Sequence, residues 1–335
     1  MRTLVTGATG FIGAHLARRL SALGHHVRAL VRHDSPSLAE VGIELVQGDV
    51  TDRGSVQDAM YGIDVVFHLA AVRDLWGTPE SVYQQVNVQG TQHLLDAAAT
   101  VGVQRFIYCS SAGVARYPGN LLADEMLPFS TPTSQVFYHR SKAQAEQMVL
   151  EYAHTGRLPT LVVRPTITYG LGDESGMVTR LITMLAQGRF IPIGNGRNHV
   201  DLVYVDDLVT GMYCALDHGA MGQAYILSGT SPIQMRALIN KICALLGRPS
   251  PRLYVPVPIA RAAGQAMEML YRFGGQLGMN LDGRQPLVTR DKVATLAVDR
   301  GFSHVRASQE LGYDPLVSYD EGLRYTLTWL LEREE

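Results

Sequence analysis

Hydrophobic and polar positions follow two different periods along the first half of the chain. Short apolar runs rich in β-branched and aromatic residues predict strands at 2–6, 26–31, 43–48, 64–68, 105–109 and 160–164. Longer stretches with apolar residues at helical spacing lie between them, notably 80–100 and 135–155. Strands that alternate with helices predict a parallel sheet with right-handed crossovers. The pattern therefore indicates a doubly wound α/β Rossmann fold.

The periodicity loosens after about residue 165, where Pro and Gly interrupt the chain more often. We expect residues 1–165 to form a Rossmann domain to which 199–230 return. Residues 166–198 and 231–335 are then expected to form a smaller C-terminal substrate-binding lobe.

A glycine-rich turn, Thr6–Gly13, joins the first predicted strand to the first helical stretch. Gly7 permits a tight turn, Gly10 lets a ligand approach the backbone, and Gly13 lets the helix pack closely on the sheet. A pyrophosphate would then meet the positive end of the helix. The alternative is an ordinary strand-to-helix turn, because glycine triplets also recur by accident.

A phenol and an ammonium, Tyr138 and Lys142, lie four residues apart and so share one face of the predicted helix. A phenol with a pKa near ~10 is too weak a base at neutral pH. A nearby ammonium stabilises the phenolate and lowers its pKa, so that the tyrosine can act as general base or general acid. We therefore predict that Tyr138 exchanges the substrate proton and that Lys142 tunes it. Alone, the pair could also be an exposed face of an amphipathic helix.

Composition narrows the class of protein. The chain has 29 basic and 31 acidic residues, a balance that gives no footprint for nucleic acid. Its three cysteines are far apart and show no metal-ligand spacing, so we expect free thiols, a reducing compartment and no metal. The N-terminus has the pattern of a strand rather than a signal peptide, and no uncharged apolar run reaches the ~20 residues of a membrane span. These features indicate a cytoplasmic protein.

Taken together, the motifs resemble those of the extended short-chain dehydrogenases/reductases, within the NAD-dependent epimerase/dehydratase superfamily. Thr6–Gly13 is similar to the family's TGxxGxxG, Asn87 to its structural Asn-x-x-Gly-Thr, and Tyr138 with Lys142 to its YxxxK. The resemblance implies an oxidoreductase acting on CH–OH groups. It also implies cofactor-binding residues, which are Gly7, Thr9, Gly10, Phe11, Ile12, Gly13, Arg32, Asp49, Val50, Leu69, Ala70, Ala71, Ser110, Tyr138, Lys142, Pro165 and Ile167.

The same resemblance implies a catalytic set of Tyr138, Lys142 and a serine that holds the substrate oxygen. Counted from the preceding strand, the family's serine falls on Ser111, with Ser110 as a close alternative. Asp49 matches the acidic residue that contacts the adenine, and Lys142 is also expected to bind the nicotinamide ribose.

The cofactor is expected to be NADP(H), with NAD(H) as the alternative. NAD-specific members usually carry an acidic residue at the end of the second strand, to hold the ribose 2′-hydroxyl. Here Val31 stands at that place and Arg32 follows it, so a guanidinium can pair with a 2′-phosphate. The alternative is that Arg32 is simply solvated.

The second half suggests a subgroup. Ile193–Asp207, the Trp76-Gly77 pair and Ala307–Tyr313 resemble segments of 3β-hydroxysteroid dehydrogenases, sterol-4α-carboxylate 3-dehydrogenases and 2-alkyl-3-ketoacid reductases. We expect a hydrophobic small-molecule substrate, first a 3β-hydroxysteroid or sterol-4-carboxylate oxidised at carbon 3. The alternatives are an NADPH-dependent long-chain 2-alkyl-3-ketoacid reductase, then a nucleotide-sugar epimerase or dihydroflavonol-reductase-like enzyme. The intact tyrosine, lysine and serine argue against a non-catalytic NADP sensor.

Residues 257–281 carry apolar side chains at helical spacing, interrupted by charges. Three interpretations stay open: a helix facing the core, a lid over an apolar pocket, or a peripheral contact with a membrane surface. Relatives often dimerise through a four-helix bundle, so we expect a homodimer formed by 80–100 and 135–155.

Overall fold

A seven-stranded sheet forms the centre of the computed structural model, which describes residues 1–73, 77–115, 122–129, 137–274, 289, 293 and 299–333. Its strand order is β10-β6-β5-β4-β1-β2-β3, and every neighbouring pair is parallel. The strands are β1 (Arg2–Thr6), β2 (His26–Val31), β3 (Glu44–Gln47), β4 (Val65–His68), β5 (Arg105–Cys109), β6 (Thr160–Pro165) and β10 (Ala224–Leu227). The predicted doubly wound Rossmann fold is confirmed.

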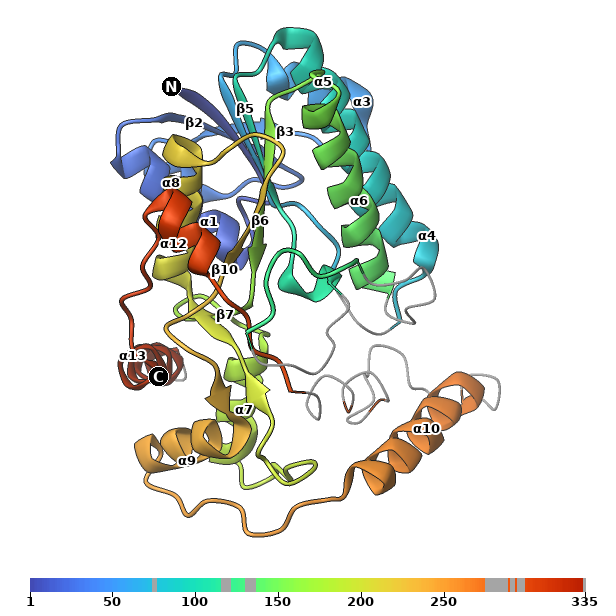
Figure 1. Ribbon diagram of the computed structural model, residues 1–335, viewed down its shortest axis with the longest axis vertical. Helices are drawn as coiled ribbons and strands as arrows, with labels where there is room; N and C mark the ends of the chain where they lie inside the picture. Colours follow the sequence, from blue (N-terminus) through green and yellow to red (C-terminus); the bar gives the residue numbers. More distant parts are fainter. Residues whose placement is uncertain are drawn as a thin grey trace.

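Helices cover both faces of this sheet (Figure 1). One layer contains α1 (Phe11–Ala22), α8 (Val205–His218) and α12 (Val305–Leu311); the other contains α3 (Arg53–Met60), α5 (Gly90–Val101) and α6 (Phe137–His154). Successive strand residues point to opposite layers, so that Leu4 belongs to the core under α3 and α5 while Val5 packs in the core with α1. Burial on both faces explains why the strands appear in the sequence as continuous apolar runs.

The predicted strands agree with the observed ones to within a residue at each end. The predicted helix 80–100 is a continuous helical stretch made of α4 (Glu80–Tyr83), a π-helical turn η1 (Gln84–Gln89) and α5. Two short elements complete this half, α2 (Pro36–Ala39) and the 3-10 turn η2 (Ala112–Val114). Of the predicted helix 135–155, the described part is α6.

A smaller lobe lies beyond the carboxyl ends of the strands, in the lower part of Figure 1. It contains two small sheets, β7 (Ile167–Tyr169) with β9 (Leu202–Tyr204) and β8 (His199–Val200) with β11 (Ile233–Gln234). Its helices are α7 (Met177–Ala186), α9 (Met235–Leu245), α10 (Val257–Gly274) and α13 (Tyr319–Glu332). The cleft between such a lobe and the strand ends is where doubly wound proteins bind ligands.

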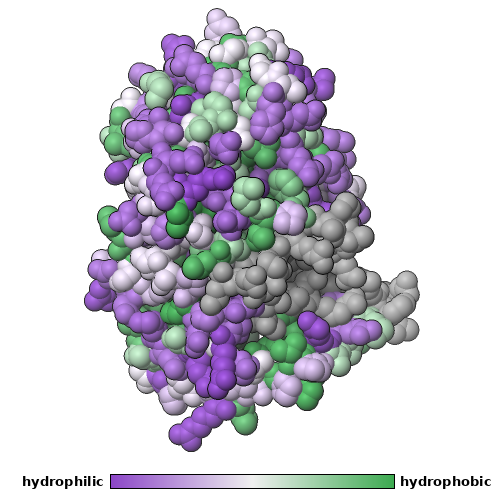
Figure 2. Space-filling view, viewed as in Figure 1, coloured by the Kyte–Doolittle hydropathy of each residue, from purple (hydrophilic) through white to green (hydrophobic). Residues whose placement is uncertain are grey.

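The segment 257–281 is helical as far as Gly274, and its last seven residues lie outside the described part of the chain, as does Trp76. Ile259, Met269 and Leu270 of α10 are exposed. Figure 2 shows hydrophobic surface in the region where Figure 1 places this helix. Within the described ranges, no helix combines the length and the apolar character needed to cross a membrane.

Candidate active site

The glycine turn after β1 packs backbone against backbone. Gly7 has φ +73°, and a Cβ there would lie 2.7 Å from the amide nitrogen of Ala70. A Cβ on Gly13 would lie 2.1 Å from the carbonyl oxygen of Gly7. Gly10 is the N-cap of α1 and has no side chain to occupy the helix end, so the first N–H groups face outward. This geometry suits a bound pyrophosphate.

A cleft of about 850 Å³ begins at this turn and continues between the sheet and the lobe. Every residue predicted for the cofactor or for catalysis lines it. They are Gly7, Thr9, Gly10, Phe11, Ile12, Gly13, Arg32, Asp49, Val50, Leu69, Ala70, Ala71, Ser110, Ser111, Tyr138, Lys142, Pro165 and Ile167. The parallel sheet makes this possible, because the carboxyl ends of β1, β2, β4, β5 and β6 lie along one edge.

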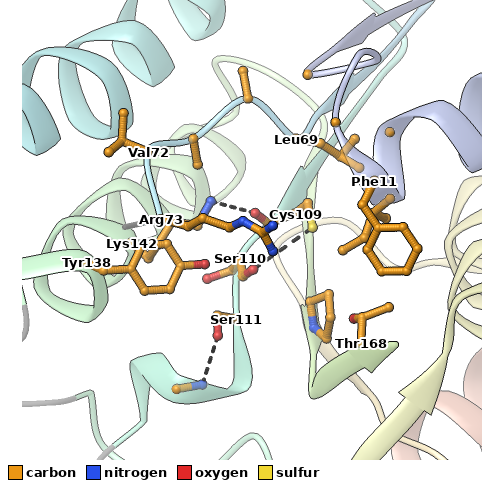
Figure 3. Close-up of a pocket in the computed structure, with 18 of the residues that line it drawn as sticks. Phe11, Leu69, Val72, Arg73, Cys109, Ser110, Ser111, Tyr138, Lys142 and Thr168 are labelled. Atoms are coloured by element: carbon orange, nitrogen blue, oxygen red, sulfur yellow. Dashed lines mark hydrogen bonds between the residues drawn. The ribbon is translucent and has the colours of Figure 1, made fainter. Parts of the chain in front are cut away.

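One part of the cleft lies between the end of β5 and the start of α6. There the side chains of Tyr138, Lys142 and Ser111 lie close together (Figure 3). Tyr138 stands at the start of α6, and the side chain of Ser111 lies beside it (Figure 3). The Nζ of Lys142 donates to the carbonyl of Cys109 at 2.6 Å and lies 4.1 Å from the centre of the Tyr108 ring. The three functional groups therefore come from the end of β5 and from one face of α6.

The surroundings of Tyr138 and Lys142 shift the pKa of both side chains. Burial raises the pKa of Tyr138 to about 12, with Cys109 adding to the effect; the charge of Arg73 and the Ser111 hydrogen bond oppose it. Burial also lowers the pKa of Lys142 to about 8. Desolvation is the largest cause of both shifts. The phenol stays protonated at neutral pH and is set up as a proton donor.

The two candidate serines differ in their partners, because Ser110 bonds to a buried ion pair. The hydroxyl of Ser110 donates to Glu146 at 2.5 Å, and the guanidinium of Arg164 donates twice to the other carboxylate oxygen, at 2.7 and 2.8 Å. Ser110 is therefore bound to Glu146, while Ser111 is the serine beside Tyr138. Glu146 was not singled out from the sequence, although it lies four residues after Lys142 on the same helix face.

Two further residues fix the loop after β4. His68 is fully buried between Thr6 and Thr91, with Nδ1 2.7 Å and Nε2 2.9 Å from their hydroxyls. Asn87, inside the π-helical turn, bonds both backbone groups of Val72 and the hydroxyl of Ser141. These bonds hold the cleft wall at Leu69–Val72 against α6.

The family model for the NAD dependent epimerase/dehydratase family matches residues 3–228. The chain belongs to this family. A 2-alkyl-3-oxoalkanoate reductase of Stenotrophomonas maltophilia is 35% identical over 97% of this chain and 98% of its own length. A 3-beta-hydroxysteroid dehydrogenase of Mycolicibacterium neoaurum is 32% identical over 98% of this chain and 91% of its own length.

Two solved structures extend the comparison. The crystal structure of gox2253 superposes with a TM-score of 0.82 at 32% identity, covering 99% of this chain and 98% of that one. DesIV, a dTDP-glucose 4,6-dehydratase from Streptomyces venezuelae with bound NAD, gives a TM-score of 0.78 at 27% identity, covering 100% and 98%. The protein is therefore an NAD-dependent oxidoreductase of the epimerase/dehydratase superfamily that acts on CH–OH groups.

At the adenosine end of the family's cofactor cleft, Arg32 is exposed and follows the buried Val31. The carboxylate of Asp49 accepts from the backbone N–H and the hydroxyl of Thr51, both at 2.8 Å. Val50 packs on Gly90, where an added Cβ would lie 2.8 Å from a Val50 methyl group. The loop after β3 is thus held rigidly beside the end of β2.

Two acidic side chains bind backbone N–H groups of distant segments. The carboxylate of Glu125 accepts from the backbone N–H of Ile226 at 2.8 Å, on strand β10. Asp206 and Asp207 both lie in the first turn of α8, whose N-cap is Tyr204. The carboxylate of Asp207 accepts from the backbone N–H groups of residues 316 and 317.

The wall of the cleft beyond Tyr138 contains residues that the sequence did not single out. They are His139, Thr168, Asp201, Arg300 and Phe302. They come from four separate segments, so only the folded chain brings them together.

Proposed function

We propose that this protein uses NADP(H) to interconvert a ketone and a secondary hydroxyl on a hydrophobic substrate, chiefly as a reductase of 2-alkyl-3-oxo acids. The observation that carries this proposal is the phenol of Tyr138, which lines the same cleft as the glycine cradle and lies beside Ser111 and Lys142 (Figure 3). A phenol that remains protonated at neutral pH suits proton donation to a ketone, which is the reducing direction.

Each residue of the set has a distinct role in this reaction. Tyr138 donates its hydroxyl proton to the ketone oxygen, and Ser111 holds that oxygen by a hydrogen bond. Lys142 is placed beside Tyr138 to bind the nicotinamide ribose hydroxyls. A nicotinamide held in this cleft would supply the hydride for the carbonyl carbon. Oxidation of the alcohol uses the same groups with the proton returning to Tyr138.

The glycine cradle fits the pyrophosphate of a dinucleotide, because any Cβ at Gly7 or Gly13 would collide with backbone atoms. Leu69–Ala71 and Pro165 with Ile167 line the path from the adenosine to the nicotinamide. The preference for NADP(H) rests on Arg32, whose guanidinium can pair with a 2′-phosphate at the end of β2.

The substrate assignment rests on two further observations. The oxoalkanoate reductase of S. maltophilia matches end to end, and apolar side chains such as Phe302 and Met177 line the substrate end of the cleft. A second candidate is the oxidation of a 3β-hydroxysterol-4-carboxylate, favoured by the full-length similarity to the M. neoaurum dehydrogenase.

The test is turnover of a 2-hexyl-3-oxo acid with NADPH, and of a 4-carboxy-3β-hydroxysterol with NADP⁺, both followed by nicotinamide absorbance. We expect the keto acid to be reduced faster. Tyr138→Phe should lower kcat by at least ~10²-fold while leaving NADPH binding unchanged, because it removes only the transferable proton. Turnover that survives this substitution would overturn the assignment of Tyr138.

We also propose the division into 1–165 with 199–230 and 166–198 with 231–335, with two exceptions: α12 packs with α8 and β10 in the first part, and β8 and β9 pair with strands of the lobe. In its support, α8 packs on α1 and β10 pairs with β6, so the returning segment completes the sheet. We also propose a homodimer through α5 and α6, because relatives often dimerise through a four-helix bundle. Sedimentation velocity tests this proposal.

A further inference from the structure

Arg300 is presented to the cleft by a segment that is bonded on both sides. Its own backbone N–H donates to the carbonyl of His199 at 2.8 Å, and the N–H of Phe302 donates to Asp201 at 3.0 Å. On the other side, Ala123 exchanges backbone bonds of 2.9 Å with the residues on either side of Phe302. Arg300 and Phe302 therefore project into the cleft from a fixed backbone.

The ring of His139 lies between this segment and the catalytic tyrosine. Its centroid is 5.3 Å from that of Tyr138, and it packs directly on Gly113, where a Cβ would lie 2.3 Å from a ring carbon. Burial lowers the pKa of His139 to about 4, and the charge of Arg300 adds to the effect. The ring is thus neutral at physiological pH and lies within the field of the Arg300 guanidinium.

Basic side chains line the part of the cleft beside Tyr138. Among the described residues they are Lys142, Arg73 and Arg300, and Figure 3 shows the side chain of Arg73 extending across the cleft beside Tyr138. Asp201 also lines the cleft; its carboxylate accepts backbone N–H bonds, and burial raises its pKa to about 7. Basic groups that line a concave site favour an anionic ligand.

We propose that Arg300, with His139 beside it, binds a carboxylate that the substrate carries next to its reacting carbonyl. The ligand class is therefore a 3-oxo acid or the matching 3-hydroxy acid, rather than a neutral ketone or sterol. A guanidinium can hold a carboxylate through two parallel bonds, and a neutral imidazole can donate one more. Phe302, on the same wall, contacts the hydrocarbon part. This inference rests on the proposed function, and it makes Arg300 a residue that determines specificity.

The experiment compares a 2-alkyl-3-hydroxy acid with its methyl ester, each oxidised with NADP⁺, because the hydroxy compounds do not lose CO2. We expect the wild-type enzyme to prefer the acid. Arg300→Gln should lower kcat/KM for the acid about tenfold to a hundredfold, mainly through KM, and leave the ester within about threefold, as expected for one lost charged contact. His139→Gln should weaken the preference in the same direction. Arg324→Gln, on the exposed face of α13, is the matched control and should change neither substrate.

Three results would overturn the inference. If Arg300→Gln lowers kcat/KM equally for the acid and the ester, Arg300 has a structural role. If the variant keeps the wild-type preference for the acid, Arg300 does not contact the substrate carboxylate. If the wild-type enzyme prefers the ester, the site does not bind a carboxylate. If the wild type oxidises neither compound, the proposed function fails. The subsite is then judged by titrating the acid into the NADPH complex: binding that Arg300→Gln abolishes supports it, and binding that does not change overturns it.

Discussion

The buried ammonium of Lys142 lowers the stability of the fold, although the proposed reaction needs this side chain. Its side chain is only 2% exposed, and burial lowers its pKa from the ordinary 10.5 to about 8. A base whose pKa is lower in the folded than in the unfolded chain binds its proton less well when folded, so its charged form destabilises the fold. Lys142→Met removes the charge and keeps a long side chain. We therefore expect the variant to be inactive but more stable at pH 7.

The magnitude follows from the structure. The difference between a pKa of 10.5 and one of about 8 corresponds to on the order of 3 kcal/mol. The variant also loses the 2.6 Å bond to Cys109 and the contact with the Tyr108 ring, worth together roughly 2 kcal/mol. The net gain in free energy of unfolding at pH 7 is then about 1 kcal/mol.

The pH dependence is the sharper test. Below pH 8 the lysine is charged in both states and the wild-type protein bears the full penalty. Between pH 8 and 10.5 only the unfolded chain stays protonated, so the wild-type stability rises with pH and the advantage of the variant disappears. The assay is urea unfolding without nucleotide, at steps from pH 7 to 10.5.

The control for this series is Lys241→Met, because that lysine forms an exposed ion pair with Asp320 at 2.6 Å. It should leave the pH dependence of stability unchanged over the same range. A Lys142→Met variant that is less stable than wild type at pH 7 and shows a constant difference up to pH 10.5 would refute the reasoning.

Three other substitutions test the cofactor cradle and its support. Arg32→Ala should weaken NADPH binding about tenfold and leave NADH within about twofold, measured by fluorescence titration; equal losses on both would contradict the 2′-phosphate contact. Gly13→Ala should weaken both cofactors, because its Cβ would lie 2.1 Å from the Gly7 carbonyl oxygen and force the turn open; unchanged dissociation constants would count against the cradle. Glu146→Gln should lower the free energy of unfolding by about 3–5 kcal/mol, since it leaves a buried arginine without its counter-charge, whereas Glu80→Gln at an exposed pair should cost less than about 1 kcal/mol.

Much of the fold could be predicted because its elements leave local patterns in the sequence. Parallel strands buried on both faces are continuous apolar runs, and glycines at a strand-to-helix turn mark a backbone contact that no other residue tolerates. Each of these signals lies within a few residues of the element it specifies. The same holds for Tyr138 and Lys142, whose shared helix face follows from their spacing alone.

The pKa values and the choice between the two serines could not be predicted in this way. The pKa values of Tyr138 and Lys142 depend on how completely other segments exclude water, and a four-residue spacing says nothing about that. The distinction between Ser110 and Ser111 depends on Glu146, which reaches the serine from a different element.

The sequence by itself therefore determined the sheet, the glycine cradle and the shared helix face of Tyr138 and Lys142, because periodicity and backbone sterics act locally. Only the tertiary structure decided which serine lies beside the phenol, which proton state burial favours, and which other side chains line the cleft. The segment of Arg300 is held at the cleft by the bond from Arg300 to His199 and the bond from Phe302 to Asp201, each across about a hundred residues of sequence. Contacts of that separation leave no local pattern, since their geometry exists only once the lobe has packed on the sheet.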